Sequence, residues 1–315
     1  MIKVIVVAGA TATGKSALAL RLAQRFNGEI VSGDSAQVYR GMNIGTAKAM
    51  AAQLSAVPHH LIDILDIYAP FSAGAFSQIA SVALREIASR GKVPIIAGGT
   101  GLYIDVLTGE TVLADSVGAC PELRRTLMER AEKEGVGALH DYLTLLDPRS
   151  AAEIHPNNVK RVIRAIEIYL TTGSTRGDLS KQAKQREGEF QRGLLLLDCP
   201  DRERLYARIN ARVDAMFEAG LEAEARDLWC AGLAETPTAS QAIGYKELFG
   251  YFEGRESLET AKEAIKQATR NYAKRQTTYF KRMKDAFVID CGDAPEAVFE
   301  KAAAYCRAFL DGTED

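Results

Sequence analysis

Apolar positions in the first third of the chain form strand-length runs separated by stretches with helical spacing. Residues 2–8 are apolar except for one lysine, which predicts a buried strand, and the spacing over 17–22 predicts a helix that ends near Asn27. Further strands are predicted at 29–32, 58–64 and 92–97, and a helix at 72–90. Strands that alternate with helices are typical of a parallel sheet with right-handed crossovers.

From about residue 121 the pattern becomes almost entirely helical. Helices are predicted at 122–134, at 137–146 (closed by Asp147 and Pro148) and at 157–170, before a polar segment over 171–189. Strands are predicted again at 192–199 and 287–291, and helices at 201–219, 221–230, 258–284 and the end of the chain. We therefore expect an α/β core of residues 1–114 and 191–315, interrupted by a helical insertion domain over 115–190.

The turn after the first strand matches a phosphate-binding loop. The pattern G-x4-G-K-[ST] is met, between a strand and a helix, by Gly9, Ala10, Thr11, Ala12, Thr13, Gly14, Lys15 and Ser16. Small residues let successive backbone N–H groups surround a polyphosphate, and the helix directs its positive end at the same anion. Lys15 would contact the terminal phosphates, and the Ser16 hydroxyl would coordinate Mg²⁺. The predicted fold class is thus α/β, a P-loop NTPase-like parallel sheet flanked by helices.

Composition and charge narrow the choice of function. Apolar residues make up 47% and charged residues 25% of the 315 positions, as in ordinary globular proteins. The formal charge of −2 provides no global positive field, so any nucleic-acid contact must come from local basic patches. The five scattered cysteines include no C-x2-C pair, which argues against a disulfide framework and a zinc site. We expect a cytoplasmic monomer with no leader and no membrane partner.

A phosphate loop specifies only a broad class, since many kinases and other NTPases share it. The strand at 92–97 leads into Gly98 and Gly99, so the acidic residue that an NTPase carries there is missing. The available acid is Asp34, at the carboxyl end of the second strand, where ligands of open α/β sheets bind. Asp34 could be a general base, could organise a metal, or could simply stabilise a turn. Thr100 could contact a ligand or belong to a tight turn.

Basic residues gather in two segments that are expected to be helical. Three lie within 160–164, and six lie within 270–284, where aromatic residues alternate with them. Such a combination suits a phosphate backbone with unstacked bases. For either segment alone, a solvated helix face is the commoner explanation, and the local clustering gains weight because the total charge is nearly neutral.

Taken in order, these motifs resemble the tRNA dimethylallyltransferases, the tRNA isopentenyltransferase family, of the bacterial type. The resemblance covers almost the whole chain, with motifs at 9–16, 34–39, 41–48, 58–63, 98–103, 156–164, 208–214, 243–247 and 269–276. Ala10 stands where the family usually has proline, and Tyr279 stands where tryptophan is common. The zinc-finger extension of eukaryotic members is not found in the sequence, as expected of a bacterial-type enzyme.

The resemblance implies transfer of a dimethylallyl group from dimethylallyl diphosphate to N6 of adenosine 37, next to the anticodon, in tRNAs reading codons that begin with U. It implies Mg²⁺ as cofactor. It also implies that Asp34 is the base, that Thr100 lies beside the substrate nucleotide, and that Arg212 contacts diphosphate, with Arg208 as a second choice. The residues it implies for contact with the tRNA anticodon stem-loop are Asp34, Ser35, Ala36, Gln37, Thr100, Lys160, Arg161, Val162, Ile163, Arg164, Gln241, Ala242, Ile243, Gly244, Tyr245, Lys246, Arg270, Lys274 and Arg275.

Three other functions compete with tRNA prenylation. A small-molecule P-loop kinase would use the same loop, but the missing acid and the basic segments argue against it. A prenyltransferase acting on free adenylates would not need a helical insertion or a long basic helix. A non-catalytic RNA-binding module would not need Lys15, Ser16 and Asp34 together.

Overall fold

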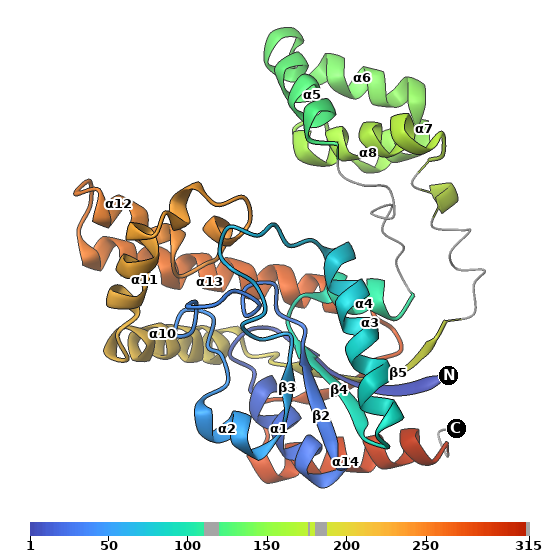
Figure 1. Ribbon diagram of the computed structural model, residues 1–315, viewed down its shortest axis with the longest axis vertical. Helices are drawn as coiled ribbons and strands as arrows, with labels where there is room; N and C mark the ends of the chain where they lie inside the picture. The colour runs from blue at the N-terminus through green and yellow to red at the C-terminus, as the bar shows by residue number, and fades with distance from the viewer. Residues whose placement is uncertain (110–119, 176, 180–187, 313–315) are drawn as a thin grey trace. The chain divides into compact units, whose positions relative to one another are not determined.

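The computed structural model describes residues 1–109, 120–175, 177–179 and 188–312, which divide into two compact units (Figure 1). Unit 1 comprises Met1–Leu107 and Glu189–Asp315, and unit 2 comprises Thr108–Gly188. The expected domain boundary at 114/115 and part of the polar segment 171–189 lie outside the described residues. Each unit has its own hydrophobic core.

In its described residues, unit 1 is built on a six-stranded parallel sheet with the order β3-β2-β4-β1-β5-β6. The strands are β1 (Ile2–Gly9), β2 (Gly28–Ser32), β3 (His59–His60), β4 (Val93–Gly98), β5 (Phe190–Asp198) and β6 (Phe287–Asp290). Because the strands are parallel, the loops that follow β1, β2 and β4 meet at the same edge of the sheet. The sheet confirms the predicted fold class, with helical unit 2 inserted between β4 and β5.

Helices cover both faces of the sheet (Figure 1), and apolar side chains of the strands pack against them. On one face, Ile5 and Val7 of β1 belong to the same buried cluster as Leu22 of α1 (Lys15–Arg25) and Phe309 of α14 (Pro295–Asp311). Strand side chains alternate, so Val4 and Val6 point to the other face. There α3 (Ala73–Ser89) packs against β1, β2 and β4.

The remaining helices of unit 1 surround the carboxyl ends of the strands or connect them. The α-helices are α2 (Ala51–Ala56), α4 (Gly101–Leu107), α10 (Arg202–Glu218), α11 (Leu221–Cys230), α12 (Phe249–Phe252) and α13 (Leu258–Phe280). Short 3₁₀ turns are η2 (Leu233–Glu235), η3 (Ala239–Gln241) and η4 (Lys246–Leu248). The long helix α13 packs against α10, α4 and β1, which brings a segment from the last fifth of the chain to the phosphate loop.

Unit 2 contains α5 (Pro121–Glu134), α6 (Val136–Leu146), α7 (Pro148–Glu153) and α8 (Val159–Thr172) around a core of leucine, isoleucine, valine and alanine. Glu167 of α8 is fully buried and accepts hydrogen bonds from Arg124 Nε (2.9 Å), Arg164 Nη1 (2.5 Å) and Cys120 N (2.8 Å). Burial opposes ionisation most strongly, but the bonds from Arg164, Cys120 and Arg124 outweigh it and hold the pKa of Glu167 below its usual range. This ion cluster ties α5 to α8.

Three of the predicted elements differ from those observed. The strand expected at 58–64 is only His59–His60, because Leu61 (φ 62°) and Asp63 (φ 56°) adopt left-handed backbone conformations that end it. Asp147 and Pro148 do not only close α6. Asp147 accepts from Ser150 N at 3.0 Å and caps a further helix, α7, with proline in its first turn. Helix α13 ends at Phe280, four residues before its predicted end.

The cysteines and the hydropathy of the helices agree with the composition. All five cysteines, which lie among the described residues, are free thiols. Of the helices that the structure describes, none is both long enough and apolar enough to cross a membrane.

Candidate functional site

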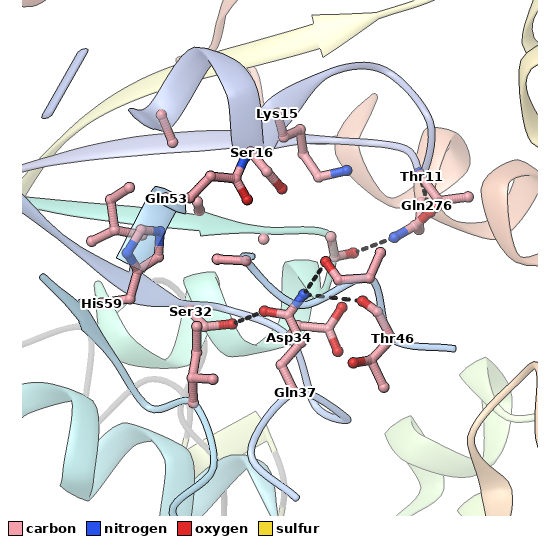
Figure 2. A pocket seen from close by; sticks show the side chains of 18 of the residues that line it. Thr11, Lys15, Ser16, Ser32, Asp34, Gln37, Thr46, Gln53, His59 and Gln276 are labelled. Carbon is pink, nitrogen blue, oxygen red and sulfur yellow. Dashed lines mark hydrogen bonds between the residues drawn. The ribbon is translucent and has the colours of Figure 1, made fainter. Parts of the chain in front are cut away.

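A pocket of about 110 Å³ lies where the loops after β1, β2 and β4 meet α10 and α13. We call it the phosphate-loop pocket. Figure 2 shows Lys15 and Ser16 on one side, Asp34 on the other, and Gln276 beside Thr11. Its lining residues include Thr11, Lys15, Ser16, Ser32, Asp34, Gln37, Thr46, Gln53, His59, Gly98, Gly99, Arg212, Tyr272 and Gln276. The pocket thus joins residues from five segments that are distant in sequence.

Backbone geometry explains the glycines at the two ends of the phosphate loop. Gly9 has φ 148°, and a Cβ at this position would lie 2.4 Å from the carbonyl oxygen of Leu197. Gly14 has φ 95°, in the region that side chains disfavour. Helix α1 starts directly after Gly14 without a side-chain cap. Its first N–H groups are therefore suited to an external anion.

Lys15 provides the ammonium group of this loop, and burial and a neighbouring arginine disfavour its charged form. Its Nζ donates to the carbonyl oxygen of Ala10 at 2.6 Å. Burial, and then repulsion from Arg212, lower the pKa of Lys15 from 10.5 to about 7, although Asp34 acts in the opposite direction. An anion between Lys15 and Arg212 would relieve that repulsion. The pocket is therefore electrostatically suited to an anion.

Asp34 provides a carboxylate in the same pocket. Its Oδ1 accepts a hydrogen bond from Ala36 N at 2.8 Å, and this turn fixes the direction of the side chain. Burial lowers the pKa of Arg212, and the Asp34 charge partly offsets that effect. Burial, followed by the Asp34 charge, raises the pKa of Tyr272 to about 12. Asp34 thus lies within electrostatic reach of two cations and of a phenol.

Helix α13 lines the pocket with Tyr272 and Gln276. The Gln276 carboxamide accepts from Thr11 N at 2.8 Å and donates to Gly99 O at 2.9 Å. Thr100 does not line the pocket. Its buried hydroxyl makes no hydrogen bond within 3.5 Å to the described residues, although the Tyr272 hydroxyl lies near enough for Thr100 to lower the pKa of that phenol slightly.

A second cavity of about 210 Å³ adjoins the first and shares Thr11, Asp34, Thr46, Arg212 and Tyr272 with it. We call it the apolar chamber. The apolar residues of its lining include Ala36, Val213, Met216, Ala242, Ile243 and Ile265. Asp34 therefore stands at the junction of a space suited to an anion and a space suited to an apolar or planar group. A molecule with both parts could place its reactive bond beside Asp34.

A half-buried carboxylate, that of Glu224, holds one wall of the apolar chamber in place. Glu224 of α11 accepts from the backbone N–H groups of Asn43 (3.1 Å), Ile44 (2.9 Å) and Gly45 (3.2 Å). It also accepts from the Tyr245 hydroxyl at 2.7 Å. A Cβ at Gly45 would lie 2.5 Å from the Tyr245 ring. The segments 43–46 and 241–247 are therefore fixed to each other through α11.

The residues predicted to contact tRNA in unit 1 occupy different surroundings. Asp34, Ser35, Ala36 and 241–244 line the apolar chamber. Gln37 is engaged inside the protein, since it accepts from Ser32 Oγ at 2.8 Å and donates to Thr46 O at 3.1 Å. Tyr245 is fully buried, whereas Lys246 is exposed. On α13, Lys274 and Arg275 are exposed, and Arg270 donates to Asn210 Oδ1 at 2.6 Å.

In unit 2, the segment 160–164 is only partly available to a ligand. Lys160 and Arg161 are exposed at the start of α8. The side chains of Val162 and Ile163 pack in the core of the unit, so they cannot offer a surface. Arg164 is paired with Glu167 in the buried ion cluster. Val162, Ile163 and Arg164 therefore stabilise unit 2, and only Lys160 and Arg161 of this segment are exposed to a ligand.

Arg208 does not belong to the pocket that contains Arg212. Its Nη1 donates to the carbonyl oxygen and the sulfur of Cys291 at 3.3 and 3.2 Å, and it lines a separate cavity with Gly14. The two arginines are one helical turn apart on α10, but only Arg212 faces Lys15 and Asp34.

The sequence does not single out Thr46 and Gln276 as lining residues, and it indicates Tyr272 only as one of the aromatic residues beside the basic ones on the last long helix. All three lie inside motifs 41–48 and 269–276, which carry the family resemblance, but no pattern indicates that their side chains meet. Met216 and Ile265 are ordinary apolar positions of helices, so only tertiary structure identifies them.

Two family models match the chain. One described as "IPP transferase" matches residues 37–283, and one described as "Isopentenyl transferase" matches residues 2–69. A tRNA dimethylallyltransferase of Geobacillus thermodenitrificans is 45% identical over 291 residues, covering 92% of this chain and 91% of the relative. One of Bacillus subtilis is 44% identical over 279 residues, covering 88% and 87%.

Solved structures give the same result. The tRNA isopentenylpyrophosphate transferase of Bacillus halodurans superposes with a TM-score of 0.74 at 39% identity, covering 99% of this chain and 98% of that one. A eukaryotic dimethylallyltransferase acting on tRNA has a TM-score of 0.84 at 30% identity, covering 99% of this chain and 80% of that one. The similarity therefore includes the whole length of the chain.

Proposed function

Because the chain belongs to the tRNA dimethylallyltransferase family, we propose that it transfers the dimethylallyl group of dimethylallyl diphosphate to N6 of adenosine 37 in tRNA. The products are N6-isopentenyladenosine and diphosphate, in tRNAs that read codons beginning with U. The observation that carries the proposal is the position of Asp34, between the phosphate-loop pocket and the apolar chamber.

The phosphate-loop pocket binds the diphosphate. Backbone N–H groups at the start of α1, Lys15 and Arg212 surround the anion. As the allylic C–O bond breaks, negative charge grows on the leaving oxygens, and fixed cations stabilise that charge more than they stabilise the intact ester. This use of the loop needs no acidic residue to position water, which agrees with the glycines after β4.

Enzymes of this kind generally need a divalent metal ion. The donors present fit a hard cation, because the Ser16 hydroxyl and the Asp34 carboxylate both line the pocket. We propose Mg²⁺, held by Ser16 and the diphosphate oxygens. When bound, it supplies positive charge to the leaving group.

Asp34 acts as the base. The exocyclic N6 of adenine is a weak nucleophile, and it must lose a proton as it forms the new bond to carbon. The N6–C bond forms while the C–O bond to diphosphate breaks, and the proton passes to a carboxylate oxygen of Asp34. The adenine must leave the stacked anticodon loop to reach this point, and it would enter through the apolar chamber.

The tRNA backbone lies along the exposed basic residues. In unit 1 these are Lys246, Lys274 and Arg275, and in unit 2 they are Lys160 and Arg161. Exposed Lys and Arg side chains suit phosphate contacts, whereas the lining of the apolar chamber suits a base. Bacterial tRNA is a cytoplasmic substrate, so we place the enzyme in the cytoplasm.

Transfer of radiolabel from dimethylallyl diphosphate with Mg²⁺ tests this function, with unmodified bulk tRNA, AMP and ATP as alternative acceptors. We expect label in tRNA alone. Label on AMP or ATP would instead indicate an enzyme of free adenylates. No transfer to any acceptor, together with ATP-dependent phosphorylation of a small molecule, would refute the proposal in favour of a kinase.

A further inference from the structure

Gln276 lies inside the site, yet none of the steps above uses it. Its side chain is 5% exposed, and both ends of its carboxamide are engaged. Oε1 accepts from Thr11 N of the phosphate loop at 2.8 Å, and Nε2 donates to Gly99 O, after β4, at 2.9 Å (Figure 2). One amide group from α13 therefore joins the two loops that line the phosphate-loop pocket.

The same face of α13 carries two other inward side chains. Tyr272 and Tyr279 lie one turn before Gln276 and about one turn after it, so the three share a helix face. Tyr272 lines the phosphate-loop pocket, and the Tyr279 hydroxyl donates to Asp105 Oδ2 of α4 at 2.5 Å. Lys274 and Arg275, between them in sequence, are exposed. One face of α13 thus packs against the site, and its exposed positions carry basic residues.

The residue at position 99 must be glycine for this arrangement. A Cβ on Gly99 would lie 2.1 Å from Gln276 Nε2, closer than any real contact, and 3.5 Å from Gly9 O. The amide of Gln276 therefore occupies the space that a side chain at position 99 would need. Removal of the amide and addition of a methyl group at 99 should have the same consequence.

We propose that Gln276 is a positioning residue that sets the orientation of the Thr11 peptide, and through it the anion-binding geometry of the phosphate loop. It acts through the loop and does not touch the reacting atoms. The inference rests on the proposed function only in that the anion is taken to be a diphosphate. Through Gln276, α13, which carries the exposed basic residues, is hydrogen-bonded directly to the phosphate loop.

The test compares Gln276→Met, which keeps the length and loses both hydrogen bonds, with Gln78→Met at an exposed position of α3. Calorimetry measures the affinity for inorganic diphosphate, and kinetics gives kcat and the KM for tRNA. We expect Q276M to weaken diphosphate binding about tenfold and to lower kcat about 10- to 100-fold, since small misplacements in a site have effects of this size. The KM for tRNA should change less than twofold, and Q78M should match the wild type.

Gly99→Ala is the second variant, which keeps Gln276 but displaces its amide. We expect G99A to repeat the losses of Q276M, and G99A combined with Gln276→Ala to be no worse than Q276A alone. Multiplicative losses in the double variant, or unchanged diphosphate affinity and kcat in both Q276M and G99A, would overturn the inference. If the wild type transferred no label to tRNA, the proposed function would fail while the diphosphate affinities still tested Gln276.

Discussion

The lowered pKa of Lys15 predicts that diphosphate binding takes up a proton. In the free enzyme, burial and Arg212 hold the Lys15 pKa at about 7. A bound diphosphate places negative charge beside the ammonium group and raises its pKa again. The bound state therefore holds more protons than the free state above about pH 7. Affinity must fall as the pH rises through that value.

The size of the effect follows from the titration of one group. At about pH 8 a group of pKa 7 is roughly nine-tenths deprotonated, so binding should take up about 0.9 proton, against about 0.1 at pH 6. For dimethylallyl diphosphate the dissociation constant should rise nearly tenfold per pH unit above about pH 8, because the terminal phosphate of this ester is already ionised there. Below about pH 6, Lys15 contributes almost no further pH dependence.

Calorimetry in buffers of different ionisation enthalpy measures this proton uptake directly. Lys15→Arg is the matched variant, since guanidinium stays charged at these pH values and should flatten the profile. Lys15→Met should bind weakly at every pH. A wild-type affinity that stays constant from about pH 6 to 9, with no proton uptake at pH 8, would show that Lys15 is charged in the free enzyme and would refute this reasoning.

Three further predictions concern other parts of the site. Asp34→Asn keeps the turn but removes the base, so transfer should fall by about 10²-fold or more while tRNA affinity, measured by filter binding, stays nearly unchanged; normal turnover would exclude Asp34 as base. Arg275→Ala should lower the slope of log affinity for tRNA against log salt by about 0.7–1, with diphosphate binding preserved, whereas Arg25→Ala at the end of α1 should leave it unchanged. Glu224→Gln replaces the carboxylate that accepts from three backbone N–H groups by a neutral amide, and it should cost about 0.5–1.5 kcal/mol in urea unfolding, compared with Glu218→Gln at an exposed position; equal stability of the two variants would contradict the role given to Glu224.

The pattern of apolar residues is sufficient to predict the central strands of the sheet, because buried parallel strands are short and almost wholly apolar. It does not predict where an element ends when local backbone conformation determines that end. Nothing in the segment 58–64 indicates that Leu61 adopts a left-handed conformation and ends β3 after two residues. Asp147-Pro148 was interpreted as the end of a helix, although the same pair also caps the next one. Such signals are ambiguous until the packing of both helices is known.

Within the site, sequence indicated the parts that depend on local geometry. The phosphate loop is a contiguous pattern, and the rule for carboxyl ends of parallel strands directed attention to Asp34. Contacts between segments that are distant in sequence could not be predicted from the sequence. No spacing relates Thr11 to Gln276, 265 residues later, and helical periodicity alone does not distinguish Arg208, bonded to Cys291, from Arg212. The roles given to Asp34, Thr100 and Arg212 stay predictions.

The two glycines after β4 explain why Asp34 is the carboxylate that serves this pocket. A Cβ at Gly98 would lie 2.3 Å from the Gly33 carbonyl oxygen, because β2 and β4 are paired immediately before this point. A Cβ at Gly99 would meet Gln276 instead. An acidic side chain at 98, where an NTPase would use it, is therefore excluded by the backbone at Gly33, and one at 99 would displace the amide of Gln276 from the phosphate loop. The two glycines thus leave no acidic side chain to position water and allow the loops to pack closely. This arrangement suits a reaction in which the nucleophile is an amine and not water.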